Sequence, residues 1–114
     1  MVYTAACGAL AALEYMVHTK QMPRDMVLLH IEIPSTLRII DSAWSPPELS
    51  TTRQIGDEWL ESMASAVLRV PSVLVPRQDN YLLNPRHHLF EAIQALETSP
   101  FAFDARIFCF PAQP

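Results

Sequence analysis

Residues 70–84 read VPSVLVPRQDNYLLN, and this stretch decides the class of fold. Val70–Pro76 is a β-branched run closed by prolines, which predicts a short strand near a sheet edge or at a bulge. Asn80–Asn84 predicts a further short extended piece. Strands are thus bunched along the chain instead of alternating regularly with helices. We therefore expect an α+β fold with a largely antiparallel or mixed sheet.

Two helices are predicted, one near the N-terminus and one across the middle of the chain. Apolar residues recur at helical spacing within Ala6–His18, and Glu14 sits beside this stripe. Thr51 or Thr52 can cap a second helix that runs to about Ala66. The first apolar stripe consists of Ala9, Leu10, Leu13, Met16 and Val17, and the second helix has Ile55, Trp59, Leu60, Met63 and Val67 on its buried side.

The remaining elements are predicted from alternation, prolines and turn residues. Extended runs are expected at Val2–Thr4, Met26–Ile33, Thr36–Ile40 and Phe101–Phe110, one or two helical turns at Leu89–Glu97, and a loop that carries Trp44 at Ser42–Ser50. No linker divides the chain, so residues 1–114 are expected to form one domain.

Composition excludes several classes of protein. The chain has 114 residues, half of them hydrophobic, and 18% are charged, so it can bury one core and is not disordered. Its apolar runs are too short to span a membrane. A net charge of −4 disfavours direct binding to nucleic acid. With glycine only at positions 8 and 56, no glycine-rich phosphate loop can be formed.

Cysteines and histidines indicate neither a disulfide framework nor a metal site. Cys7 and Cys109 are far apart and show no metal-ligand spacing, so both are expected to be small buried hydrophobes. The apolar stretch Ala5–Leu13 lacks the basic region of a signal peptide, which favours a reduced, cytoplasmic protein. The adjacent His87 and His88 have no further ligands at a zinc-like interval, so no metal is expected.

Several separated motifs resemble the RES domain, the toxin half of RES–Xre toxin–antitoxin pairs. They are YTAACGALAALEYMVH at residues 3–18, GDEWL at 56–60, VPS at 70–72, NYLLNP at 80–85 and FDAR at 103–106, and they occur in the family's order. The resemblance runs from Tyr3 to Phe108. It implies a fold similar to that of ADP-ribosyltransferases, with helices flanking the sheet, and an enzyme that splits the bond between nicotinamide and ribose.

The resemblance also implies partners and site residues. NAD+ would be the substrate, with no resident cofactor, an Xre-like helix-turn-helix antitoxin would cover the site, and a homo-oligomer is left open. Glu14 matches the family's glutamate and Ser72 its serine. The family's arginine lies upstream of the tyrosine that Tyr3 matches, so the resemblance implies a domain that lacks its N-terminal part. The acceptor of the ADP-ribosyl group, water, phosphate or protein, stays open.

Physical chemistry gives these residue types a role. Loss of nicotinamide builds positive charge on the ribose, which a carboxylate such as Glu14 stabilises. The Ser72 hydroxyl either bonds neighbouring backbone or has a functional role, in which it bonds the substrate or holds Glu14 in place. A serine nucleophile is disfavoured because no histidine and acid partners are suggested. Tyr3 can stack on nicotinamide or ribose, and Asn80 can bond ribose hydroxyls. We predict that Tyr3, Glu14 and Ser72 converge on one cleft.

Other polar residues have structural interpretations. Asn84 precedes a proline and is predicted to form a turn. Asp104 and Arg106 either pair across the sheet or support the site, and the structural role is preferred. His18 and His30 are expected to be structural or on the surface. Two further functions remain open: a non-catalytic remnant that only binds an antitoxin-like partner, and an unrelated α+β ligand-binding module.

Overall fold

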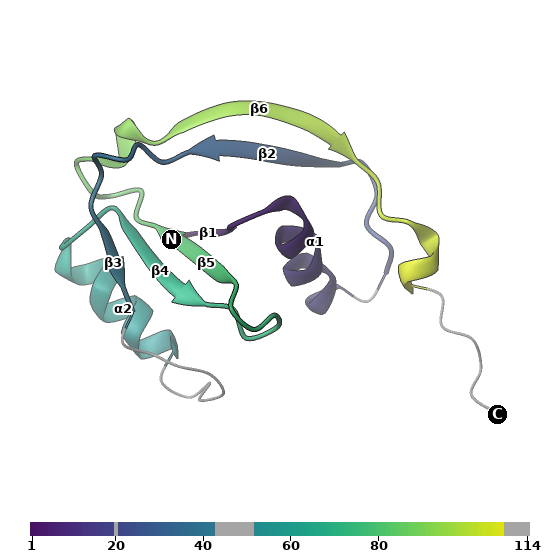
Figure 1. The fold of residues 1–114 in the computed structure, drawn as a ribbon, viewed down its shortest axis with the longest axis horizontal. Coiled ribbons are helices and arrows are strands. Elements are labelled where there is room, and N and C mark those ends of the chain that lie inside the picture. The colour runs from purple at the N-terminus through teal and green to yellow at the C-terminus, as the bar shows by residue number, and fades with distance from the viewer. Residues whose placement is uncertain (20, 43–51, 109–114) are drawn as a thin grey trace.

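A computed structural model of the chain describes residues 1–19, 21–42 and 52–108. In these ranges a four-stranded sheet has the order β1-β5-β4-β3, and β2 and β6 form a separate two-stranded ribbon (Figure 1). The α+β class is confirmed, and the sheet is mixed because β3 runs parallel to β4 while the other pairs are antiparallel. The elements are β1 (Val2–Ala5), α1 (Gly8–Val17), β2 (Met26–Glu32), β3 (Ile39–Asp41), α2 (Thr52–Ser62), β4 (Val67–Pro71), β5 (Asp79–Leu83) and β6 (Gln94–Phe101), with short 3₁₀ helices at Phe90–Ala92 and Ala105–Phe108.

The register of the central strands decides which side chains share a face. Leu82 on β5 lies opposite Tyr3 on β1 and Leu68 on β4, and Asn80 lies opposite Val70. Because side chains alternate across a strand, these residues project from the same face of the sheet. This face carries the candidate site.

Helix α2 covers one part of that face. Trp59 is 6% exposed and packs with Leu68 and Leu82, which confirms it as a core residue. Its indole Nε1 donates to Ser65 Oγ over 2.9 Å, so the buried polar atom of the ring is satisfied. The opposite face of the sheet has its own core, in which Val67 and Leu83 pack with Leu37 and Ala66.

Helix α1 lies under the ribbon of β2 and β6 (Figure 1). A Cβ at Gly8 would lie 3.1 Å from Leu28 Cδ2, so this glycine allows the helix to approach the ribbon closely. The apolar stripe that was predicted for this helix is present, but most of it is not buried. Of its residues only Leu10 is buried, whereas Leu13 and Val17 are exposed, because the ribbon and β1 cover only part of the helix.

Two predicted boundaries are wrong around β4. The strand begins at Val67 instead of Val70 and lies inside the sheet between β5 and β3, not at an edge. Pro71 is tolerated because it is the last residue of the strand. Helix α2 ends at Ser62, short of Ala66, because Met63 takes a left-handed conformation with φ of 56°, which terminates a helix.

The C-terminal prediction is also partly wrong. The expected helical turns at Leu89–Glu97 reduce to a 3₁₀ helix followed by β6, because residues 94–101 find a partner in β2. Asp104 and Arg106 do not pair across the sheet. They lie beyond β6 and form a local ion pair of 2.8 Å, in which the guanidinium holds the pKa of the Asp104 carboxyl below its usual value.

Cys7 is exposed, so the prediction that it is buried is wrong. It occupies the N-cap position of α1, where the chain turns from β1 into the helix at the surface. Cys109 and most of the predicted loop with Trp44 lie outside the described residues. No helix in the described ranges is long and apolar enough to cross a bilayer.

Asn84 connects the end of α2 to the end of β5, and its side chain is completely buried. Its Nδ2 donates to the Leu60 carbonyl over 3.2 Å, and its Oδ1 accepts from the Arg86 amide over 3.0 Å. The second bond forms the turn that was predicted for this residue. Both partners would lose their hydrogen bonds if this side chain were removed.

We expect Asn84→Ala to lower the free energy of unfolding by about 2–3 kcal/mol, because it removes the hydrogen bonds to Leu60 and Arg86 and leaves a cavity where a completely buried side chain was. Urea denaturation measures the change. Gln94→Ala, at an exposed position of β6, should stay within about 0.5 kcal/mol of the unsubstituted chain. An equally small effect of Asn84→Ala would contradict the connecting role.

Candidate functional site

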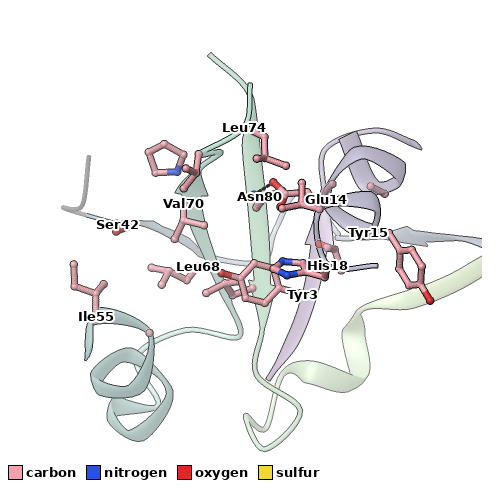
Figure 2. Close-up of a pocket in the computed structure, with 18 residues that line it drawn as sticks. Tyr3, Glu14, Tyr15, His18, Ser42, Ile55, Leu68, Val70, Leu74 and Asn80 are labelled. Atoms are coloured by element: carbon pink, nitrogen blue, oxygen red, sulfur yellow. Dashed lines mark hydrogen bonds between the residues drawn. The ribbon is translucent and has the colours of Figure 1, made fainter. Parts of the chain in front are cut away.

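A pocket of about 720 Å³ lies between the sheet, α1 and α2 (Figure 2). This volume is in the range of sites for small-molecule ligands. Most of its lining is aliphatic, and the polar lining side chains include Glu14 and Asn80. Among the described lining residues, Glu14 carries the only carboxylate and there is no lysine or arginine. The wall of the pocket therefore favours a ligand that is cationic near Glu14.

One side of α1 faces the pocket. Ala11, Glu14, Tyr15 and His18 all line it, and their spacing of three and four residues places them along the same stripe of the helix. The apolar stripe predicted from the sequence is a neighbouring face. Glu14 is thus held towards the sheet instead of towards solvent.

The carboxylate of Glu14 is anchored through one oxygen. Its Oε1 accepts hydrogen bonds from Ser72 Oγ, at 3.2 Å, and from Asn80 Nδ2, at 2.9 Å. These partners are 58 and 66 residues away in the sequence. Within the described part of the chain, no hydrogen bond occupies Oε2. The carboxylate is therefore held in one orientation while its second oxygen keeps its capacity to accept hydrogen bonds.

Ser72 lies behind Glu14. It is 3% exposed and is not among the residues that line the pocket. Its Oγ accepts from the amides of Leu74 and Val75, at 3.1 and 3.2 Å, so the single hydroxyl proton is available for Glu14. Of the two functional roles considered from the sequence, this geometry corresponds to holding Glu14 in place.

Asn80 lies on β5, in the middle of the sheet, and is 5% exposed. Donation from Nδ2 to Glu14 fixes the orientation of its amide, because a carboxylate can only accept. Its Oδ1 is buried and has no partner among the described residues. An unsatisfied buried acceptor is uncommon, and beside a pocket it is typical of a position that a ligand or water completes.

Tyr3 lines the pocket from β1 (Figure 2). The residue as a whole is 67% exposed, so a face of its ring is free to stack on a ligand. The pKa of its phenol is raised, first by partial burial of the hydroxyl and then by the negative charge of Glu14. The hydroxyl therefore stays neutral near pH 7. The predicted convergence of Tyr3, Glu14 and Ser72 takes the form of two lining residues and one buried supporting residue.

Sequence reasoning missed two contributions to the pocket. His18, expected to be structural or on the surface, lines the pocket at the C-terminal end of α1. Its spacing of four residues from Glu14 is a signal that could have placed it there. Ile55 and Gly56 line the pocket from α2, although Ile55 was assigned only to the buried side of that helix.

His87 and His88 lie elsewhere and have a structural arrangement. Their rings stack with centroids 4.5 Å apart, and His87 Nδ1 accepts from the Leu89 amide. Within residues 1–19, 21–42 and 52–108, no group of three or more histidine, cysteine or acidic side chains could hold a metal ion.

Comparison with known proteins identifies the family. The model of the RES domain matches residues 1–104. The chain is 37% identical to the "Toxin Res" of Yersinia enterocolitica over 93% of its own length and 76% of that protein. It is 36% identical to the "Toxin Res" of Pseudomonas putida, over 95% and 79% of the two chains.

A third relative carries a more informative name. The "Prs ADP-ribosylating toxin" of a Sphingobium species is 31% identical, over 94% of this chain and 74% of that protein. The family match covers the strands and both helices that build the pocket. The resemblance drawn from the motifs is confirmed, and the chain belongs to the RES domain family.

Proposed function

We propose that this chain is a RES toxin that splits the nicotinamide–ribose bond of NAD+ on a fold similar to that of ADP-ribosyltransferases. The observation that carries the proposal is the Glu14 carboxylate, which is anchored through Oε1 and has Oε2 unoccupied at the wall of a ligand-sized pocket. The name of the Sphingobium relative, an ADP-ribosylating toxin, supports the same class of chemistry.

The chemistry requires a fixed negative group. As the bond between ribose C1′ and the ring nitrogen breaks, its electron pair goes to nicotinamide and positive charge develops on the ribose. Glu14 Oε2 would accept a hydrogen bond from a ribose hydroxyl and stabilise that charge. Because Ser72 and Asn80 already hold the carboxylate, little reorganisation is needed in the transition state. The stabilisation therefore acts on the transition state more than on the bound substrate.

Two further side chains fit this substrate. A ribose hydroxyl can donate to Asn80 Oδ1, which would satisfy the buried acceptor. Tyr3 offers an exposed aromatic face for stacking on nicotinamide or ribose. The nicotinamide ring of NAD+ is positively charged, so the carboxylate of Glu14 also favours its binding in the pocket.

We also propose that an Xre-like helix-turn-helix antitoxin covers the pocket and that the toxin acts in the cytoplasm. Water, phosphate or a protein side chain can each accept the ADP-ribosyl group from such a site. The remnant hypothesis differs in one measurable respect. A remnant and a toxin both bind the antitoxin-like partner. When the purified chain is incubated with NAD+, the toxin releases nicotinamide and the remnant does not.

Glu14→Gln is expected to lower the rate of nicotinamide release at least about 100-fold, because it removes the negative charge and keeps the shape. Release is followed by chromatography, and circular dichroism checks the fold. Glu61→Gln, on the exposed side of α2, should leave the rate unchanged. If Glu14→Gln retains full activity, the proposed role of the carboxylate is wrong.

Ser72→Ala is expected to lower kcat about tenfold and to leave KM within about twofold, since the serine supports Glu14 and does not line the pocket. Activity should remain above that of Glu14→Gln because the bond from Asn80 persists. Ser99→Ala, half-buried on β6, is the matched control. A raised KM with unchanged kcat would instead mean that Ser72 contacts the substrate.

A further inference from the structure

Gly56 lies in the interior of α2, where glycine is less favourable than alanine. A glycine in this position usually has a steric or conformational reason. It has no positive φ, so the backbone conformation does not require it. Some other constraint must explain why this position has no side chain.

Close packing does not explain Gly56 either. A Cβ at this position would meet only the Met1 Cε atom, at 3.4 Å, which is the flexible end of a side chain. Gly8 shows the contrasting case, in which a Cβ would come within 3.1 Å of Leu28 in a packed contact. Gly56 is buried, but a Cβ here would make only an ordinary van der Waals contact with Met1 Cε, so the packing leaves room for a methyl group.

The helix geometry shows what that space is. Gly56, Trp59 and Leu60 follow one another at spacings of three and four residues, so they share a face of α2. At Trp59 this face packs on Leu68 and Leu82, and one turn earlier Gly56 lines the pocket. Because Gly56 lines the pocket and a Cβ there would contact only Met1 Cε, a longer side chain at this position would narrow the pocket.

The surrounding wall indicates what fits there. Ile55, Leu68 and Val70 line the side of the pocket nearer α2, whereas Glu14 and His18 lie on the side of α1 (Figure 2). Aliphatic side chains beside a helix position without a side chain make an apolar, uncharged surface. Such a surface suits a planar ring better than a phosphate or a sugar, because it offers contact area and few polar partners.

We propose that Gly56 determines substrate specificity by leaving room for a planar heteroaromatic ring at the α2 end of the pocket. The inference rests on the proposed function, because a dinucleotide supplies two such rings, nicotinamide and adenine. It gives a role to a residue of α2 in a site whose polar groups Glu14 and Asn80 come from α1 and the sheet.

Gly56→Ala tests the inference because stability and binding should change in opposite directions. Alanine favours the helix, so we expect Tm to rise by about 4 °C. The added methyl group enters the pocket, so the dissociation constant for NAD+ should rise about tenfold, and Gly56→Leu should raise it about 100-fold. Binding is measured by calorimetry in a Glu14→Gln background, where splitting of the bond is expected to be at least about 100-fold slower.

Two fragments of the substrate identify the ring. Nicotinamide mononucleotide lacks adenine, and ADP-ribose lacks nicotinamide. If the α2 end of the pocket binds nicotinamide, Gly56→Ala weakens the binding of nicotinamide mononucleotide and leaves the binding of ADP-ribose unchanged. If it takes adenine, the pattern is reversed. Either selective pattern supports the inference, whereas equal weakening of both fragments or no weakening overturns it.

Asp57→Ala is the matched control, since it makes a similar change at the next, exposed residue of α2. It should leave all three dissociation constants unchanged. A fall in Tm on Gly56→Ala would show that packing requires the glycine and would overturn the inference. If the unsubstituted chain releases no nicotinamide and binds none of the three ligands, the proposed function itself fails, which is a different result.

Discussion

The antiparallel pairing of β4 with β5 is the constraint on which the rest of the structure depends. It places Leu68 opposite Leu82 and Val70 opposite Asn80, which creates one surface for α2 to pack on and another for the pocket. The connection between the strands is closed by the bond from the Ser72 amide to the Gln78 carbonyl, at 2.8 Å. Both donors to Glu14 therefore come from a single hairpin, and their relative positions do not depend on the helices.

The parts of the fold that could be predicted are those in which local pattern and tertiary environment agree. The helix at residues 8–17 and the strands at 2–5, 26–32 and 79–83 match the expected elements within a few residues. The candidate site residues Glu14 and Ser72 could be selected only through the family resemblance. By local pattern alone, Glu14 is an ordinary helical glutamate beside an apolar stripe.

The remaining elements could not be predicted, because they depend on tertiary contacts that the sequence pattern does not show. Residues 73–75 have the composition of a strand, but the amides of Leu74 and Val75, which a strand would need for pairing, donate to the Ser72 hydroxyl. Residues 72–78 turn instead. Residues 94–101 form a strand because β2 is available to pair with them. The apolar stripe of α1 is mostly not buried, because the ribbon and β1 cover only part of the helix and another part of it faces the pocket.

Glu14 and its two hydrogen-bond donors are far apart in the sequence, so the site can assemble only late in protein synthesis. Glu14 emerges from the ribosome first, and Ser72 and Asn80 follow 58 and 66 residues later. Until the hairpin has been made and has folded against α1, this glutamate is a solvated side chain with no fixed direction. A growing chain that stops before Asn80 thus contains the carboxylate without its orientation. The assembled site is therefore present in the cell only after synthesis of the hairpin is finished.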